Sequence, residues 1–306
     1  MEKVAKMQNA EQQQQPENYI NKVTFRDKLR EYKKHPKSLV VMILVMLSAV
    51  FAVGILLFLM IYILANGIPH LTAEQFEWKY TPENQSMMPA IINTLTMTVL
   101  TLLIAVPVGI FAAVYLVEYA KRGNKLVKII RITTETLSGI PSIVYGLFGF
   151  LLFNMQLGWQ YAMLGGIITL AIMILPLIIR TTEEALLAVP DSYREGSYGL
   201  GAGKMRTVFR IILPAAIPGI MSGVILSIGR IVGESAALIY TSGTFRSTPS
   251  GIWDSSATLT VHMYVQSNEG LHVNQAFASG VILLVLTFLI NLASDLIERH
   301  IAKKKG

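Results

Sequence analysis

Two residues of opposite charge, Arg230 and Glu234, lie inside a long apolar segment of the sequence. On a continuous helix their i, i+4 spacing places both side chains on one face, close enough to pair. Charges inside an apolar span are costly and usually face a cavity or each other. The two residues therefore indicate either a structural ion pair or an anion site. An anion site suits the residue types, because a guanidinium matches the fork geometry of a phosphate group.

In the anion-site interpretation, Glu234 neutralises Arg230 when the site is empty and moves away as an anion passes. Ser235 follows directly and adds a hydroxyl group, while Gly229 and Gly233 flank the two charges and leave room beside the helix. Arg230, Glu234 and Ser235 are therefore candidate substrate-path residues.

A second polar segment, Ser138–Gly149 (SGIPSIVYGLFG), brings hydroxyl groups to the start of another apolar run. Its proline lets the segment bend and leaves backbone carbonyl groups without helical partners. The segment either lines a path for a polar solute or is a kinked packing helix, and the residue types alone leave both interpretations open. Its candidate path residues are Ser138, Ser142 and Tyr145.

The candidate path residues must be positioned by long apolar segments of the chain. Ser38–Ala65 and Ala90–Val117 each contain 28 residues without a charge, and about 20 suffice to cross the hydrocarbon core of a bilayer. Thr136–Ile179 is a charge-free run of 44 residues, which fits two spans. Ile211–Tyr240 and Ala276–Ala293 are two further runs. We therefore predict an all-α protein with six membrane-spanning helices.

The distribution of Lys and Arg predicts the orientation of these spans. The segment before residue 38 carries nine of these residues, 118–139 and 180–210 carry five each, and the segment after 298 carries four. Segments 67–89 and 241–275, which alternate with the basic ones, carry one each. The positive-inside rule then places both termini in the cytoplasm. The net charge of +7 is explained by orientation and lipid contact rather than by nucleic-acid binding.

The predicted organisation is one membrane domain at 38–298 with a cytoplasmic loop at 181–211. Residues 1–37 are expected to form a solvated cytoplasmic tail, and residues 299–306 a short second one. The predicted spans are about 38–65, 90–117, 137–155, 162–179, 212–240 and 276–297.

The cytoplasmic loop is predicted to contain a short surface helix. Asp191 or Ser192 is a suitable N-cap after Pro190, and the helix is expected to run to about Leu200. Gly201 should end it, because glycine adopts the left-handed conformation that a sharp reversal requires.

This loop resembles the EAA signature of ABC importer permeases, which reads Glu-Ala-Ala, three residues, Gly, nine residues, Ile, any residue, Leu-Pro. Gly196 and Ser197 stand where that pattern has alanines, and Gly196 weakens the helix by up to about 1 kcal/mol. In that family the loop forms a coupling helix seated in a cleft of the ATPase subunit. The resemblance therefore implies these ATPase-coupling residues: Glu195, Gly196, Ser197, Gly201, Ile211, Leu213 and Pro214.

The run Gly229-Arg230-x-x-Gly233-Glu234-Ser235 and the Ser138–Gly149 segment resemble the permease subunits of the Pst phosphate importer. The run Thr258–Tyr264 (TLTVHMY) is closer to the A-type subunit than to its C-type partner. The resemblance covers about residues 38–298. It implies a six-helix, MetI-like permease of a type I importer that works by alternating access with a C-type permease, a dimer of ATP-binding subunits and an extracytoplasmic phosphate-binding protein.

Other sites receive less support. Gly201-x-Gly203-Lys204 lacks the spacing of a nucleotide-binding loop, so ATP is expected on the partner and no cofactor on this chain. The five histidines are irregularly spaced and no cysteine is present, so no metal site is expected. The long external loop Thr241–Gln275 is expected to be hydrated surface, or a docking face with Arg246 as an entrance charge.

Two other classes of protein remain as alternatives. An ion-coupled secondary anion transporter would also bury an arginine and a glutamate, but it needs no ATPase-docking loop and typically has a doubled architecture. A membrane enzyme would need a catalytic constellation, and the sequence offers none.

Overall fold

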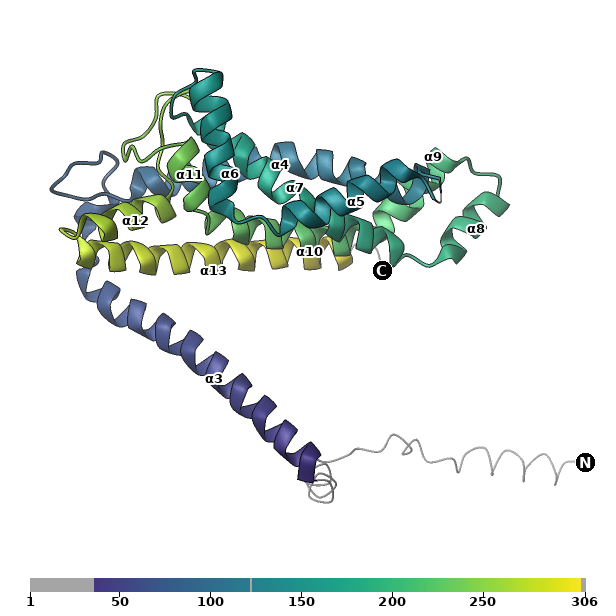
Figure 1. The fold of residues 1–306 in the computed structure, drawn as a ribbon, viewed down its shortest axis with the longest axis horizontal. Helices are drawn as coiled ribbons and strands as arrows, with labels where there is room; N and C mark the ends of the chain where they lie inside the picture. Colours follow the sequence, from purple (N-terminus) through teal and green to yellow (C-terminus); the bar gives the residue numbers. More distant parts are fainter. Residues whose placement is uncertain (1–35, 122, 304–306) are drawn as a thin grey trace, which may run out of the picture. The chain divides into compact units, whose positions relative to one another are not determined.

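A computed structural model describes residues 36–121 and 123–303, which form helices and loops without a β-strand (Figure 1). The chain divides into two units, residues 1–61 and 62–306. In the first unit the described residues belong to α3 (Pro36–Gly67), and its apolar side chains from Val40 to Ile61 are mostly exposed. The predicted tail at 1–37 lies almost wholly outside the described residues.

The second unit is built around four helices that pack side by side: α4 (Met88–Val114), α7 (Met163–Leu187), α10 (Leu213–Val232) and α13 (Val273–Lys303) (Figure 1). Close packing uses small residues, as is usual inside bilayers. A Cβ atom on Gly109 of α4 would lie 2.5 Å from Cγ2 of Ile178 on α7. The other elements of this unit are η1 (Ile68–His70), η2 (Ala73–Phe76), η3 (Tyr115–Tyr119), α5 (Lys125–Ser138), α6 (Ser142–Gly149), η4 (Phe150–Gln156), α8 (Asp191–Gly199), α9 (Lys204–Thr207), η5 (Val208–Ile212), α11 (Ala236–Thr241) and α12 (Leu259–Glu269).

Five described helices are long and apolar enough to cross a membrane: Lys37–His70, Met88–Tyr119, Met163–Leu187, Lys204–Val232 and Val273–Leu296. A sixth span exists if the pair Val127–Ser138 and Ser142–Gln156 is counted as one, although the two helices meet at 103°. The structure is therefore an all-helical membrane protein with five or six spans.

The predicted span at 137–155 is wrong at its start. Residues 137 and 138 end α5, and the apolar helix begins only at Ser142, after the break at Gly139–Pro141. The physical reason is Pro141, whose ring disfavours helical geometry in the residue before it. α5 is an amphipathic helix in its own right.

The predicted span at 212–240 is also wrong, because α10 stops at Val232. Gly233 ends the helix with its N–H bonded to the carbonyl of Gly229 at 3.1 Å, and the short helix α11 starts at Ala236. The apolar run is therefore two elements that meet at the two candidate charges.

The external loop at 241–275, for which the sequence predicts hydrated surface or a docking face, is exposed along much of its length but has a buried middle segment. It contains α12, and the residues from Ser256 to His262 are buried. Two hydrogen bonds join this segment to α4: Asn93 Nδ2 donates to the carbonyl of Ala257 at 3.1 Å, and the N–H of Leu259 donates to Thr94 Oγ1 at 2.8 Å.

Candidate functional site

The loop between α7 and α10 forms the predicted short helix, α8, followed by a tight reversal. α8 starts at Asp191 after Pro190, so Pro190 occupies the N-cap position and the prediction of Asp191 or Ser192 as the cap is wrong. The end is as predicted: Leu200 caps the helix and Gly201 has φ +82°. That left-handed residue lets the N–H groups of Gly201 and Ala202 bond back to the last turn of α8.

Ser197 does more than supply the small side chain that a docking helix requires, because it also makes a buried hydrogen bond. Its hydroxyl group lies 2.8 Å from that of Thr207, and both side chains are buried. The bond joins α8 to α9, which leads through η5 into α10. An alanine at 197, as the EAA pattern has, cannot make this bond.

The second half of the motif anchors the loop in the bundle. Ile211 and Leu213 are partly buried against a core cluster that includes the fully buried Ile212. Pro214 occupies the second position of α10, the helix that directly follows the π-helical turn η5. These residues therefore hold the base of the loop rather than its exposed surface.

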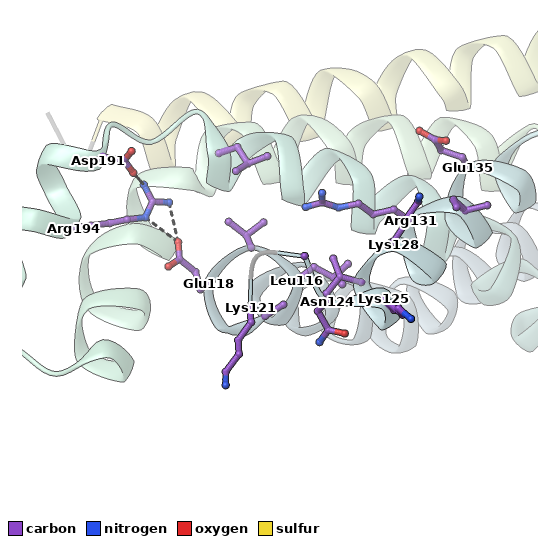
Figure 2. Close-up of a pocket in the computed structure, with 16 residues that line it drawn as sticks. Leu116, Glu118, Lys121, Asn124, Lys125, Lys128, Arg131, Glu135, Asp191 and Arg194 are labelled. Carbon is purple, nitrogen blue, oxygen red and sulfur yellow. Dashed lines mark hydrogen bonds and ion pairs between the residues drawn. The ribbon is translucent and has the colours of Figure 1, made fainter.

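Arg194 ties α8 to two membrane helices, and sequence reasoning missed it. Figure 2 shows its guanidinium between Glu118 and Asp191. Nη2 of Arg194 lies 2.8 Å from Oε1 of Glu118, in η3. The same side chain donates to the carbonyls of Leu186 and Val189, where α7 ends. The only signal in the sequence was an arginine one residue before the motif.

The exposed side of the loop is partly apolar. Glu195 and Gly196 face solvent, and no heavy atom lies within 4 Å of a Cβ built on Gly196. The apolar part was also missed: Leu200 is 91% exposed and Met205 71% exposed, with Tyr193 and Tyr198 also exposed. Exposed apolar side chains beside a polar rim are typical of a protein interaction site.

A basic pocket of about 780 Å³ adjoins the Arg194 contact (Figure 2). Arg131 on its wall pairs with Glu183 of α7. Arg194 also lines the pocket, and its three lysine lining residues, Lys121, Lys125 and Lys128, are exposed. The pocket therefore extends the positive charge of this face from α5 to α8.

The predicted Arg230–Glu234 pair does not form among the described residues. Because α10 ends between them, their spacing is no longer helical. Glu234 is buried, and its Oε1 accepts the N–H of Ala237 at 3.1 Å, so the carboxylate caps α11. Arg230 is half-buried in the last turn of α10, where a cation interacts favourably with the helix dipole, and it makes no ion pair or hydrogen bond within the described residues.

The structure places the other four candidate path residues separately. Tyr145 is brought near Arg230: α6 packs on α11, and the Arg230 charge lies within electrostatic reach of the Tyr145 hydroxyl, which donates to the carbonyl of Leu137 at 2.8 Å. Ser235 precedes α11 and lines a separate pocket of about 460 Å³. Ser138 is exposed at the end of α5 and donates to the carbonyl of Glu135. Ser142 is half-buried at the first position of α6.

The family of binding-protein-dependent transport system inner membrane components matches residues 105–305, which include the whole loop and both charged residues. The chain therefore belongs to this family, whose members are non-catalytic permease components of ABC transporters.

Three relatives illustrate the similarity. The chain is 33% identical to a probable ABC transporter permease protein, YqgI, of Bacillus subtilis, with 84% of this chain and 94% of the relative aligned. It is 34% identical to the phosphate transport system permease protein PstA of Mycobacterium leprae, over 78% and 80% of the two chains. It is 31% identical to PstA of Yersinia pestis, over 89% and 92%.

Solved structures show the same fold at lower identity. A bacterial alginate ABC transporter in complex with a pentasaccharide-bound periplasmic protein matches with a TM-score of 0.66, 19% identity, and coverage of 90% of this chain and 99% of that one. The inward-facing MetNI methionine ABC transporter matches with a TM-score of 0.55 and 22% identity, covering 79% and 97%. The fold is thus that of a MetI-like ABC importer permease.

Proposed function

We propose that this chain is a membrane-spanning permease subunit of an ATP-driven importer whose substrate is inorganic phosphate. The observation that carries the proposal is the similarity along most of the chain to permeases named for phosphate transport, at 31–35% identity. The half-buried Arg230 supports the same substrate, because a guanidinium that has no anionic partner within the described residues and lies in an apolar region favours an anion.

The proposed assembly contains a C-type permease, a dimer of ATP-binding subunits and an extracytoplasmic phosphate-binding protein. Both termini and the α8 loop would face the cytoplasm, following the positive-inside rule. ATP would bind to the partner subunits and not to this chain. Leu200 and Met205 would then enter the cleft of the ATP-binding subunit, because they are the most exposed apolar side chains of the loop.

The loop and Arg230 lie at opposite ends of one long element, which supports a mechanism of alternating access. Lys204–Val232 is a single apolar helix of 29 residues, so Lys204 and Arg230 are about 39 Å apart along its axis. Closure of the ATP-binding dimer would pull on α8. The Ser197–Thr207 bond would pass that motion to this helix and move Arg230 relative to α11 and α6.

Uptake of radiolabelled phosphate by cells that express the whole complex tests the proposal. We expect Arg230→Gln to abolish uptake while the ATP-binding subunit still copurifies, and Arg230→Lys to retain part of it. Arg180→Gln is the control, because Arg180 is exposed and its ion pair, within the described residues, is with its helical neighbour Glu184. Normal uptake by Arg230→Gln would place the anion path elsewhere.

An ion-coupled secondary transporter, which the sequence alone left open, is disfavoured by the family to which the chain belongs. It would purify without an ATP-binding subunit and would transport phosphate in a proton or sodium gradient alone. Copurification of a stoichiometric ATPase, lost when residues 195–204 are deleted, would exclude it.

A further inference from the structure

A second arginine lies near the other end of the bundle, in a pocket that the proposed function does not use. The pocket has a volume of about 680 Å³ and is lined by Arg246 and several hydroxyl side chains. It involves the loop between α11 and α12, at the end of the second unit opposite to α8 and α9 (Figure 1). In the proposed orientation this is the extracytoplasmic mouth.

Arg246 is held in place without using all its donors. Its Nη1 donates to the Tyr80 hydroxyl at 2.6 Å and to Oε1 of Gln85 at 3.4 Å, and its Nη2 donates to Glu269. Its guanidinium carbon also lies 5.5 Å from the centre of the Tyr80 ring. A guanidinium has five N–H donors, so two remain without a protein partner among the described residues.

The carboxylate that balances Arg246 is the more exposed member of the ion pair. The side chain of Arg246 is 12% exposed, whereas that of Glu269 is 44% exposed. An ion pair with one partner in water contributes little, typically below about 1 kcal/mol. Glu269 can therefore turn into solvent while Arg246 stays fixed by Tyr80 and Gln85.

The rest of the pocket wall offers neutral hydrogen-bond donors. Tyr161, Thr244 and Ser247 line it, and their hydroxyl groups make no hydrogen bond within the described residues. Tyr80 accepts from Arg246, so its own proton remains available for another acceptor. A fixed guanidinium with hydroxyl donors around it suits a tetrahedral oxyanion, which accepts several hydrogen bonds at once.

We propose that the Arg246 pocket is a second oxyanion site, which takes phosphate at the extracytoplasmic mouth before it reaches Arg230. Glu269 competes with the anion for the guanidinium and keeps Arg246 neutralised when the site is empty. The inference rests on the proposed function for the identity of the anion.

Equilibrium binding of radiolabelled orthophosphate to the purified complex, without the external binding protein, tests the pocket directly. We would measure it in an Arg230→Gln background, which removes the inner site. Arg246→Gln should abolish the remaining binding, and Glu269→Gln should tighten it about five-fold, because it removes the competing carboxylate. Lys79→Gln is the matched control, since Lys79 is an exposed cation of the neighbouring loop, and it should leave binding unchanged.

Arg246→Gln and Glu269→Gln are expected to change phosphate binding in opposite directions. That difference distinguishes a binding site from a purely structural ion pair. If Arg246–Glu269 only holds the loops together, both variants weaken binding or lower thermal stability alike, and the inference is overturned. Absence of phosphate binding in the Arg230→Gln background also overturns it. Failure of the proposed function is a different result: the wild-type complex would then not import phosphate at all.

Discussion

Glu118 and Arg194 are 76 residues apart in the chain, yet they form a largely buried ion pair in which Oε1 accepts from Nη2 at 2.8 Å and from Nε at 3.1 Å. Their side chains are only 5% and 15% exposed. Glu118 lies at the end of the helix Met88–Tyr119, and Arg194 lies in α8. The pair therefore fixes the proposed coupling helix to a membrane span independently of the covalent connections to α7 and α9.

Replacing Arg194 should detach α8 from the bundle. Arg194→Gln leaves the buried Glu118 carboxylate without its cation, and breaking a buried pair in this way costs about 3 kcal/mol. We expect the ATP-binding subunit to copurify poorly and phosphate uptake to fall with it. Thermal unfolding of the purified complex would measure the accompanying loss of stability.

Arg180→Gln is the matched control for that experiment. Its partner Glu184 is one helical turn away, and the two side chains are 62% and 63% exposed. An exposed pair of this kind contributes little, so copurification should be unchanged. Equal copurification in the Arg194 and Arg180 variants would show that the Glu118 contact does not hold the loop.

Two glycines of the loop should respond to alanine in opposite directions. Gly196→Ala meets open space in a helix, and it should stabilise α8 by up to about 1 kcal/mol. Gly201→Ala must adopt φ +82°, which costs about 1–2 kcal/mol for a residue with a Cβ atom. Thermal unfolding of each variant measures the difference, and ATPase activity of the complex shows whether the geometry of the loop survives.

Gly196→Ala and Gly201→Ala also test the interpretation of the EAA-like motif. A gain from Gly201→Ala would mean that the reversal after Leu200 does not need a left-handed residue. A loss from Gly196→Ala would mean that position 196 meets a surface of the partner subunit that a Cβ atom obstructs.

Local signals in the sequence predicted the loop well and the end of α10 badly. Gly201 predicts the reversal because the requirement for positive φ is local to that residue. The apolar run through Tyr240 hid the break at Gly233, because the residues after it are as apolar as those before. Gly233 ends the helix, and Glu234 caps the start of α11, a contact that hydropathy does not report.

Contacts between distant segments explain the remaining misses. His262 lies in a polar-looking loop sequence, yet it is fully buried, because the segment before it bonds to α4 about 164 residues away. In the sequence, Glu118 and Arg194 are two of several charged residues in segments that were predicted to be cytoplasmic. Neither position carries a local pattern, so only the folded arrangement identifies the pair.

Glu234 should behave as a helix cap rather than as the partner of Arg230. Glu234→Gln keeps a side-chain oxygen for the N–H of Ala237 and should leave assembly intact, whereas Glu234→Ala removes the cap at about 1 kcal/mol. Thermal unfolding of the two variants tests this order. If both variants lose the same stability, the charge of Glu234 matters more than the hydrogen bond.

His262 should make the stability of the protein sensitive to acid. Burial, with a smaller contribution from the charge of Arg246, lowers the pKa of His262 from 6.5 to about 4. Between these values the unfolded chain binds a proton that the folded chain does not, so stability falls as the pH falls from 6.5 towards 4. The full loss is about 3 kcal/mol. Thermal unfolding of the purified complex between pH 7 and pH 4.5 measures it.

His262→Leu should remove most of this pH dependence and should also stabilise the protein at pH 7. Both ring nitrogens of His262 are buried without a hydrogen-bond partner among the described residues, and an unsatisfied buried polar group costs about 1–3 kcal/mol. Leucine fills a similar volume without that cost. Glu269 adds a separate loss only at lower pH, because the Arg246 hydrogen bond lowers its pKa below the usual 4.5 and the resulting stabilisation is present above that value. His70→Gln is the control, since His70 is exposed. A dependence between pH 7 and pH 4.5 that persists in His262→Leu would assign it to a titrating group other than His262.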